Sequence, residues 1–408
     1  MAAAEPAAHG ATPVVVMDNG SCLFRAGYPS ESAPRVLIPS LVGLPRNKGV
    51  AMAAGYREYE VGYGALEQQG NLDTSQPVRA GVVTNWHDME RLWSHVIYKE
   101  LRIAPENFCF VISESTKNSE KDKERTLEML METFNAHSMY LGSTAVLALY
   151  SYGSTTGVVL DSGLDRTNVV PVHEGYPLSR HMTTSKIAGD ALTSHLCSLL
   201  NAKGYGFSTR TEQALVNQVK ESLCFVRDAA AGPGEEAAMA GAAADEGFQL
   251  PDGQHIPMED ERFACTEVLF NHGLLGAQHV PKTKVFDETG AEYQPTINKG
   301  VSWMVYASIN NCEQSLRRDL FNNVVLAGGS TLFPGMRLRI QQEVTQLYKD
   351  MHPGEGLIPI SIHEMACRQH ATWLGGCMLS QIAMFPHLTV TRDEYHEHGA
   401  SIVHCKSL

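Results

Sequence analysis

The chain has 408 residues, of which 43% are hydrophobic and 19% charged, so it has room for two or three ordinary domains and is not disordered throughout. Asp and Glu outnumber Lys and Arg by 45 to 32, and the resulting net charge of -13 argues against general nucleic-acid binding. No apolar run approaches the roughly 20 residues of a membrane-spanning helix, so no membrane span is predicted.

Nine cysteines are scattered along the chain without a Cys-x-x-Cys pair. This spacing predicts neither a zinc module nor a disulfide framework, and reduced thiols in a cytosolic or nuclear compartment are the simpler interpretation. Residues 1–13 lack the basic region and the apolar stretch of a secretory signal, so they are predicted to form a flexible tail.

A strand followed by a glycine turn occurs twice in the chain. The apolar run Val14–Met17 predicts a buried strand that ends in the tight turn Asp18-Asn19-Gly20-Ser21. Val158–Leu160 leads into Asp161-Ser162-Gly163 in the same way. The sequence therefore predicts two copies of one strand-and-turn device, each with an aspartate at the turn.

Helical and extended patterns alternate between the two copies. Apolar residues at helical spacing predict an amphipathic helix over Trp86–Leu101, with Thr84 or Asn85 as its N-cap. Phe108–Ile112 predicts a strand, and Asp122–Phe134 predicts another helix. This alternation favours the α/β class.

The second half continues the alternation. The low-complexity stretch Ala229–Gly247 predicts an exposed loop, because Gly232-Pro233-Gly234 argues against an alanine-rich helix. The remaining predicted elements are strands at Asn168–Val172, Val324–Ala327 and Ile358–Ile362, and helices at Ile187–Leu200, Thr211–Arg227, Val301–Leu316, from Pro334-Gly335 to Tyr348, and at Gln369–Gln381 as the last long helix.

The paired turns suggest phosphate binding. Glycine lets successive backbone N–H groups approach an anion, so two such turns facing each other would clamp a polyphosphate. Asp18 and Asp161 would then hold Mg²⁺ through water, since this ion keeps several waters and takes one or two carboxylates. Either turn alone is more often an ordinary hairpin, and it is the pair that favours the phosphate site.

Three further motifs are less specific. The glycine-rich segment 328–335 would let the backbone approach a flat ligand such as a nucleobase or ribose, although an ordinary strand-to-helix loop is the more frequent outcome. Lys220 and Glu221 could be a solvated pair. His396 and His398 lie two residues apart on a predicted helix, where their side chains point different ways, so surface histidines are favoured over a metal site.

Several segments resemble actin and the actin-related proteins, in order from about Val14 to the C-terminus. They are VVVMDNGSCLFRAGY, GVVTNWHDMERLWSHVIYKELRIAPEN, GVVLDSG, VVLAGGSTLFPG, ATWLGGCML and EYHEHGASIVH. The resemblance implies the fold shared with heat-shock chaperones and sugar kinases, in which two ribonuclease-H-like α/β domains close on ATP and Mg²⁺. The implied first domain is 14–151 with 371–408, including a small outer subdomain at 39–79. The implied second domain is 152–370, with an outer subdomain at 188–275 and an insertion near 276–300.

The resemblance also implies a nucleotide site for ATP or ADP. Its residues are Asp18, Gly20, Ser21, Cys22 and Arg25 in the first phosphate loop, Asp161 and Gly163 in the second, Lys220 and Glu221 at the base and ribose, and Gly328, Gly329, Ser330 and Leu332 in the adenosine loop. Arg25 stands where the family has a phosphate-contacting lysine. The departures are Cys22 in place of a glycine, Leu164-Asp165 in place of Asp-Gly, and Gln369 in place of a lysine near the adenine.

Hydrolysis is predicted to be weaker than binding. Family members position the attacking water with a Gln and a His, and the collinear residues here are Thr144 and Asn168. Thr is too short to reach as far as Gln, and Asn cannot accept a proton as imidazole does. Slow or absent ATP turnover is therefore expected, the alternative being weak activity through a water bridged from Thr144.

Two segments bear on assembly. Residues 47–60 match the mobile loop that actin filaments use between subunits, but read NKGVAMAAGYREYE, and residues 274–301 are longer than their actin counterpart. These differences argue against ordinary homopolymer packing and leave room for a dedicated partner contact, although a surface insertion is usually tolerated without consequence.

The combined prediction is a divergent actin-related protein that binds ATP and serves as an assembly subunit. Its expected partners are other actin-family or complex subunits, with the cytosolic chaperonin for folding, in the cytoplasm and cytoskeleton, or alternatively the nucleus or cilium. The rival predictions are a conventional filament-forming ATPase and a phosphotransferase of the same superfold. The latter needs an acidic base at a small-molecule pocket, and the phosphate-loop acids are the only candidates.

Overall fold

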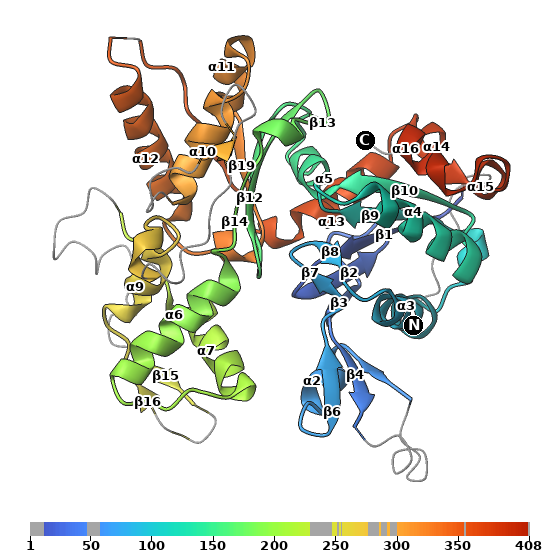
Figure 1. Ribbon diagram of the computed structural model, residues 1–408, viewed down its shortest axis with the longest axis horizontal. Helices are drawn as coiled ribbons and strands as arrows, with labels where there is room; N and C mark the ends of the chain where they lie inside the picture. Colours follow the sequence, from blue (N-terminus) through green and yellow to red (C-terminus); the bar gives the residue numbers. More distant parts are fainter. Residues whose placement is uncertain are drawn as a thin grey trace. The chain divides into compact units, whose positions relative to one another are not determined.

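The computed structural model describes residues 12–46, 58–228, 247–250, 253, 255–275, 285–286, 292–293, 300–354 and 356–406. The chain divides into two compact units (Figure 1). Unit 1 comprises Met1–Thr155, Gly175–Pro177 and His370–Leu408, and unit 2 comprises Thr156–Glu174 and Leu178–Gln369. The described residues leave out residues 1–11 of the predicted tail, 229–246 of the predicted loop, 47–57 of the segment 47–60 and most of the segment 276–300.

A six-stranded mixed sheet forms the centre of unit 1, in the order β21-β10-β9-β1-β2-β3. Strand β1 (Val14–Asn19) runs parallel to β9 (Cys109–Glu114), which runs parallel to β10 (Ser138–Ser143). Every residue of β9 and β10 is buried, as expected for parallel strands covered on both faces. The predicted strands in this half are confirmed. The outer strands are β2 (Leu23–Gly27), β3 (Val36–Pro39) and β21 (Val390–Thr391).

Amphipathic helices cover this sheet. Helix α3 (Trp86–Ser94) continues as a π-helix to Leu101, and the Asn85 side chain caps it by accepting a hydrogen bond from Asp88 N. The predicted helix Asp122–Phe134 is found as α4 (Glu120–Glu128) and a π-helical turn, Met129–Thr133. The other helices of this unit are α5 (Thr144–Tyr150), α13 (Ala371–Ser380), α14 (Phe385–Leu388), α15 (Arg392–His398) and α16 (Val403–Lys406).

The prediction that Gln369–Gln381 forms the last long helix is confirmed, except that the helix begins two residues later and ends one residue earlier. Residues Arg368–His370 form a 3₁₀ turn, helix α13 begins at Ala371, and short helices follow it. Near-complete burial of one α13 face comes from its packing on α5, where Gly375 lies against the Leu147 carbonyl. Periodicity predicted the element but not the later helices, which are each seven residues or fewer.

Small elements complete unit 1. A three-stranded sheet consists of β4 (Val42–Pro45), β5 (Glu60–Val61) and β6 (Leu72–Ser75), with α2 (Tyr63–Glu67) between β5 and β6 in the chain. The remaining strands are β7 (Val78–Arg79), β8 (Val82–Val83) and β13 (Tyr176–Pro177).

Unit 2 repeats the central strand arrangement of unit 1. Strand β11 (Gly157–Ser162) pairs antiparallel with β12 (Thr167–His173) and parallel with β19 (Val324–Ala327), all four of whose residues are buried. Strand β14 (Thr183–Ser185) pairs with β12, and β20 (Ile362–His363) pairs with β19. Both units therefore place a hairpin directly beside a parallel strand.

The predicted strand Ile358–Ile362 is wrong except for its last residue. Pro359 has no N–H to donate to a ladder. Ser361 N instead donates to Phe321 O at 3.0 Å, and the ladder with β19 begins only at Ile362.

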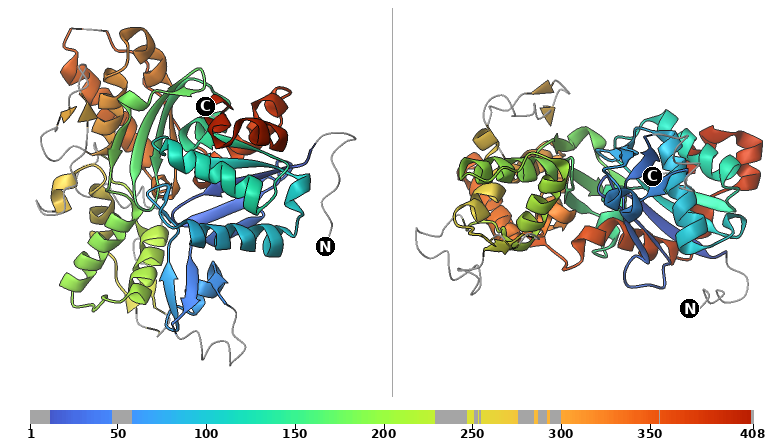
Figure 2. Two further views of the ribbon diagram at one scale, coloured as in Figure 1. Left: turned by 45° about the vertical axis from the view of Figure 1, so that its right-hand side comes forward. Right: turned by 90° about the horizontal axis from the view of Figure 1, so that it is seen from below.

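The helices of unit 2 include α6 (Gly189–Ala202) and α7 (Arg210–Leu223), which lie side by side in each view (Figures 1 and 2). The predicted helix Val301–Leu316 is wrong, because α10 (Val301–Asn310) ends before α11 (Gln314–Asn322) begins. The break is stabilised by Arg317 Nε, which donates to Cys312 O at 2.9 Å. The other elements are α9 (Glu261–Glu267), α12 (Met336–Met351), β15 (Phe248–Gln249), β16 (His255–Ile256), β17 (Val285–Phe286) and β18 (Glu292–Tyr293).

Within the described ranges, no helix combines the length and the apolar character that crossing a bilayer requires.

Candidate functional site

The two predicted strand-and-turn devices are β-hairpins with the same register. Asp18 of β1 faces Arg25 of β2, and Asp161 of β11 faces Asn168 of β12. Each aspartate is the next-to-last residue of its strand, so the turn begins after it, at Gly20 and Gly163, and not at the aspartate as predicted. The physical reason is that antiparallel pairing extends one residue past each aspartate.

Asp18 is buried and both of its carboxylate oxygens accept hydrogen bonds. Ser113 Oγ donates to Oδ1 at 2.7 Å, and Arg25 Nη1 donates to Oδ2 at 3.1 Å. Ser113 Oγ also accepts from Asn19 N at 2.9 Å. Sequence reasoning missed Ser113. A signal was present, because Ser113 follows the predicted strand Phe108–Ile112 and the carboxyl ends of parallel strands meet at one sheet edge.

Arg25 is held on two sides. Its Nη1 also donates to Leu23 O at 3.2 Å, and its Nε donates to His370 Nδ1 at 3.1 Å. The Arg25 and Asp18 side chains are only 12% and 9% exposed. His370 is 345 residues away in sequence, and no sequence signal pointed to it. A guanidinium held in this way is fixed in position beside the first turn.

The first turn is tightly constrained. Gly20 N donates to Asp18 O at 3.0 Å, and a Cβ on Gly20 would lie 2.4 Å from Leu23 O, so this position needs glycine. Ser21 Oγ accepts from Gly81 N at 3.2 Å. Cys22 is exposed. The predicted residues of the first loop are thus clustered in unit 1, with the Cys22 side chain on the surface.

Stability should depend on the protonation of His370. Burial is the main cause that lowers the His370 pKa below its ordinary 6.5, with a further contribution from the Arg25 charge, while Asp18 opposes them. The native state therefore binds this proton less readily than the unfolded state, and stability present above about pH 6.5 is lost as the pH falls further. His370→Asn keeps an acceptor for Arg25 Nε but does not titrate. We expect its urea-unfolding free energy to fall less than that of the wild type between about pH 7.5 and about pH 5.5; equal losses would contradict this role.

The second turn is connected to two other segments of unit 2. Gly163 O accepts from Gly189 N at 3.0 Å and from Ser330 Oγ at 2.8 Å. Gly189 is the first residue of α6, and Ser330 belongs to the predicted adenosine loop. Leu164 O accepts from Asp190 N at 2.8 Å. The predicted second phosphate loop and the predicted adenosine loop are therefore in direct contact.

Lys220 extends this network, whereas Glu221 does not point into it. Lys220 is 4% exposed, and its Nζ donates to Gly189 O at 2.9 Å and to Thr193 Oγ1 at 2.8 Å. Glu221 is exposed and accepts from Asn217 Nδ2 at 2.7 Å. Adjacent helix positions face different directions, so the two members of the predicted pair have different surroundings.

The glycine segment after β19 approaches the second hairpin closely. Gly328 has a φ of 84°, and a Cβ there would lie 2.3 Å from Ser162 O and 2.4 Å from Asp161 Oδ1. A Cβ on Gly329 would meet no atom within 4 Å. Leu332 is 39% exposed. Arg368, which sequence reasoning missed, is buried and donates to Thr331 O at 2.8 Å, so it holds this loop in place.

The two predicted hydrolysis positions lie on different kinds of element in the two units. Thr144 is the first residue of α5, directly after β10. Asn168 lies opposite Asp161, and its Oδ1 is buried without a hydrogen-bond partner among the described residues. Directly opposed residues share one face of a hairpin, so Asn168 and Asp161 are neighbours. Asp165 and Gln369, two of the predicted departures, are half-buried.

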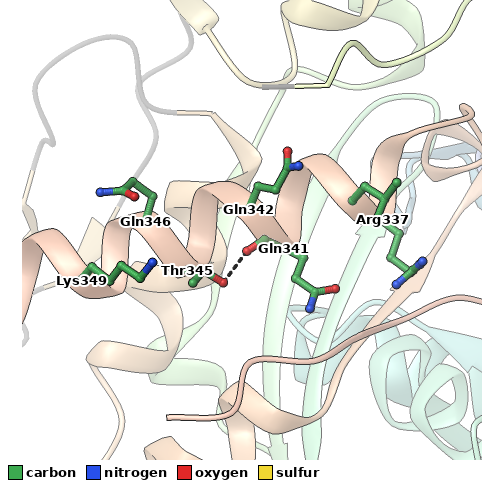
Figure 3. Close-up of a pocket in the computed structure, with 7 residues that line it drawn as sticks. Arg337, Gln341, Gln342, Thr345, Gln346 and Lys349 are labelled. Carbon is green, nitrogen blue, oxygen red and sulfur yellow. Dashed lines mark hydrogen bonds between the residues drawn. The ribbon is translucent and has the colours of Figure 1, made fainter. Parts of the chain in front are cut away.

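A surface groove elsewhere in unit 2 contains none of the predicted site residues. It has a volume of about 660 Å³ and runs along one face of α12 (Figure 3). Thr345 Oγ1 donates to Gln341 O at 2.6 Å within it. Its lining residues are Arg337, Leu338, Gln341, Gln342, Thr345, Gln346 and Lys349.

Two α/β units that each carry an aspartate hairpin beside a parallel strand define a protein with a duplicated α/β core. The family model described as Actin matches residues 9–408. The chain therefore belongs to the actin family, and its fold is the actin-like α/β fold, as the sequence predicted. Proteins of this family generally bind ATP or ADP with a divalent cation.

The residues around Asp18 fit a divalent cation poorly. A hydrated Mg²⁺ is held by carboxylate oxygens that accept from its waters. Both Asp18 oxygens already accept from Ser113 and Arg25, and the Arg25 charge would repel a second cation. Among the described residues, no three or more His, Cys, Asp or Glu side chains are grouped to hold a metal ion. A water-mediated role for Asp161 stays a prediction.

Proposed function

We propose that this chain is an ATP- or ADP-binding member of the actin family that hydrolyses ATP slowly or not at all and acts as an assembly subunit of a cytoskeletal or larger complex. The observation that carries the proposal is the hydrogen-bonded network of unit 2. Gly189 N and Ser330 Oγ both donate to Gly163 O, and Lys220 Nζ donates to Gly189 O. Actin-family membership supports nucleotide binding by these residues.

The glycines of this network could bring backbone N–H groups close to the phosphates and the base of a nucleotide. Glycines at the second turn and at 328–329 allow backbone N–H groups to approach phosphate or a flat base. Gly329 has open space at its Cβ position, whereas Gly328 is packed against the hairpin. We propose that Lys220 and Glu221 lie near the base and ribose, with Leu332 contributing apolar contact. Both hairpins bind phosphate oxygens in this proposal.

Weak hydrolysis follows from the side chains at the two water-positioning sites. Thr144 has one short hydroxyl, and the Asn168 amide oxygen can accept a hydrogen bond from a water but cannot take its proton. The buried Asn168 Oδ1 has no partner among the described residues, which is consistent with a bound water there. A site that positions the attacking water but cannot accept its proton should bind ATP and hydrolyse it slowly.

Restoring the family's side chains should increase hydrolysis. We expect the double substitution Thr144→Gln and Asn168→His to raise single-turnover phosphate release by about tenfold or more, because general-base assistance contributes about 10²–10⁴-fold when well positioned. The measurement is release of labelled phosphate from ATP bound to the full chain. Each single substitution serves as a control for the pair. Wild-type release as fast as that of a conventional actin would contradict the proposed weak turnover.

The assembly role is tested separately from nucleotide binding. We propose that the chain works with other actin-family or complex subunits, after folding by the cytosolic chaperonin, in the cytoplasm and cytoskeleton, or alternatively in the nucleus or cilium. Sedimentation after addition of ATP, Mg²⁺ and salt separates this proposal from its rival. Purified chain that stays in the supernatant supports a subunit role, whereas pelleted polymer would favour a conventional filament-forming protein.

A further inference from the structure

The first hairpin carries its own counter-charge. Arg25 lies directly opposite Asp18 in the β1–β2 register and contacts its carboxylate at 3.1 Å. Both side chains are about nine-tenths buried, where an opposite charge is screened little by solvent. The carboxylate that the family places beside nucleotide phosphate is thus already neutralised by a guanidinium of the same chain.

A divalent cation at such a site normally prevents repulsion between the carboxylate and the phosphate. We propose that Arg25 takes over this task, so that the first hairpin binds nucleotide phosphate without a bound divalent cation. This inference rests on the proposed nucleotide binding and names how the charge of that site is balanced. It follows from the poor fit of a cation beside Asp18.

Arginine is suited to contact Asp18 and a phosphate at once. Its guanidinium has five N–H donors in a planar fork, whereas lysine has a single nitrogen. Arg25 Nε donates to His370 Nδ1, and Arg25 Nη1 donates to Asp18 Oδ2 and to Leu23 O. Within the described part of the chain, the two N–H groups of Nη2 are therefore left for a phosphate oxygen.

The surroundings hold this pair in one geometry. His370 Nδ1 accepts from Arg25 Nε on one side, and Ser113 Oγ donates to the far oxygen of Asp18 on the other. A preorganised ion pair loses less side-chain entropy when a ligand binds. The second hairpin has no such ion pair across its register, because the residue opposite Asp161 is the uncharged Asn168. The proposed charge balance is thus specific to the first hairpin.

Equilibrium binding of ATP to the full chain tests the proposal, measured once with MgCl₂ and once with EDTA. The Asp161→Asn variant is measured beside the wild type, because it removes the other carboxylate that is predicted to hold Mg²⁺ through water. We expect the two dissociation constants of this variant to agree within about threefold, since the first hairpin needs no cation. Weakening of this variant by about 100-fold or more in EDTA would overturn the inference and leave the proposed function intact. Absence of ATP binding by the wild type under both conditions would overturn the proposed function and this inference together.

Substitutions separate the role of Arg25 from general stability. Arg25→Gln leaves Asp18 without its counter-charge, so we expect ATP binding in EDTA to weaken by about tenfold or more relative to binding in MgCl₂. Arg25→Lys keeps the charge and should show a smaller difference. Arg125→Gln, in an exposed pair with Glu128, is the matched control and should behave as the wild type. Equal binding by Arg25→Gln with and without Mg²⁺ would contradict the proposal. If Arg25→Gln does not fold, the comparison of MgCl₂ with EDTA in Asp161→Asn decides the proposal.

Discussion

Replacing Gly328 with alanine is expected to destabilise unit 2 by about 3–5 kcal/mol and to abolish retention of a nucleotide. The backbone φ of 84° is strained for any residue with a Cβ, and that Cβ would lie 2.3 Å from Ser162 O. Its contact with Asp161 Oδ1, at 2.4 Å, would also displace the carboxylate. The loop and the second hairpin would have to separate, which disrupts the network through Gly163.

Thermal unfolding and nucleotide content of the full chain measure this effect. A loss of this size should lower the midpoint of the unit 2 transition by about 10 °C. Gly206→Ala, in the same unit and outside the proposed nucleotide site, is the matched control, because its Cβ would meet no atom within 4 Å and the variant should change neither quantity greatly. Similar behaviour of the two variants would mean that close packing at Gly328 does not hold the loop.

Replacing Gly375 with alanine is expected to destabilise unit 1 by about 3 kcal/mol or more. A Cβ at this position would lie 1.6 Å from Leu147 O, which is far inside van der Waals contact. The obstacle is the backbone of α5, so a change of side-chain rotamer cannot relieve it. Helix α13 would have to move away from α5 and from β1, where Trp373 Nε1 donates to Val16 O at 3.2 Å.

Urea unfolding followed by tryptophan fluorescence reports this change, because Trp373 is fully buried in the affected contact. Gly70→Ala is the control in the same unit, since Gly70 is exposed and its Cβ would contact nothing within 4 Å. An unfolding midpoint for Gly375→Ala equal to that of Gly70→Ala would show that the two helices can separate at little cost.

Local patterns predicted most of the core elements. Val14–Met17 and Val324–Ala327 are uniform apolar runs because these parallel strands are covered on both faces. The helix after Asn85 was recognisable from its period and its cap. One error arose where a local contact interrupts a favourable pattern: the Cys312 carbonyl accepts a hydrogen bond from Arg317, and this contact lies where α10 gives way to α11.

The site was only partly predictable, because its contacts join residues far apart in sequence. Asp18 and Gly328 could be found from short motifs. Ser113, 95 residues from Asp18, could have been found only from its place after a predicted parallel strand, and no signal pointed to His370, which lies 345 residues from Arg25. The Arg25–Asp18 pair was within reach, because the seven-residue separation fits opposed positions of a hairpin, but the position of the turn had to be known.

Nucleotide content is the most direct test of the proposed function. Full-length protein purified under native conditions is denatured, and the released small molecules are separated by chromatography. We expect about one equivalent of ATP or ADP per chain, because a ligand that binds the native state stabilises it and is carried through purification. Folded protein that releases no purine nucleotide and binds none when ATP is added back would contradict the proposal.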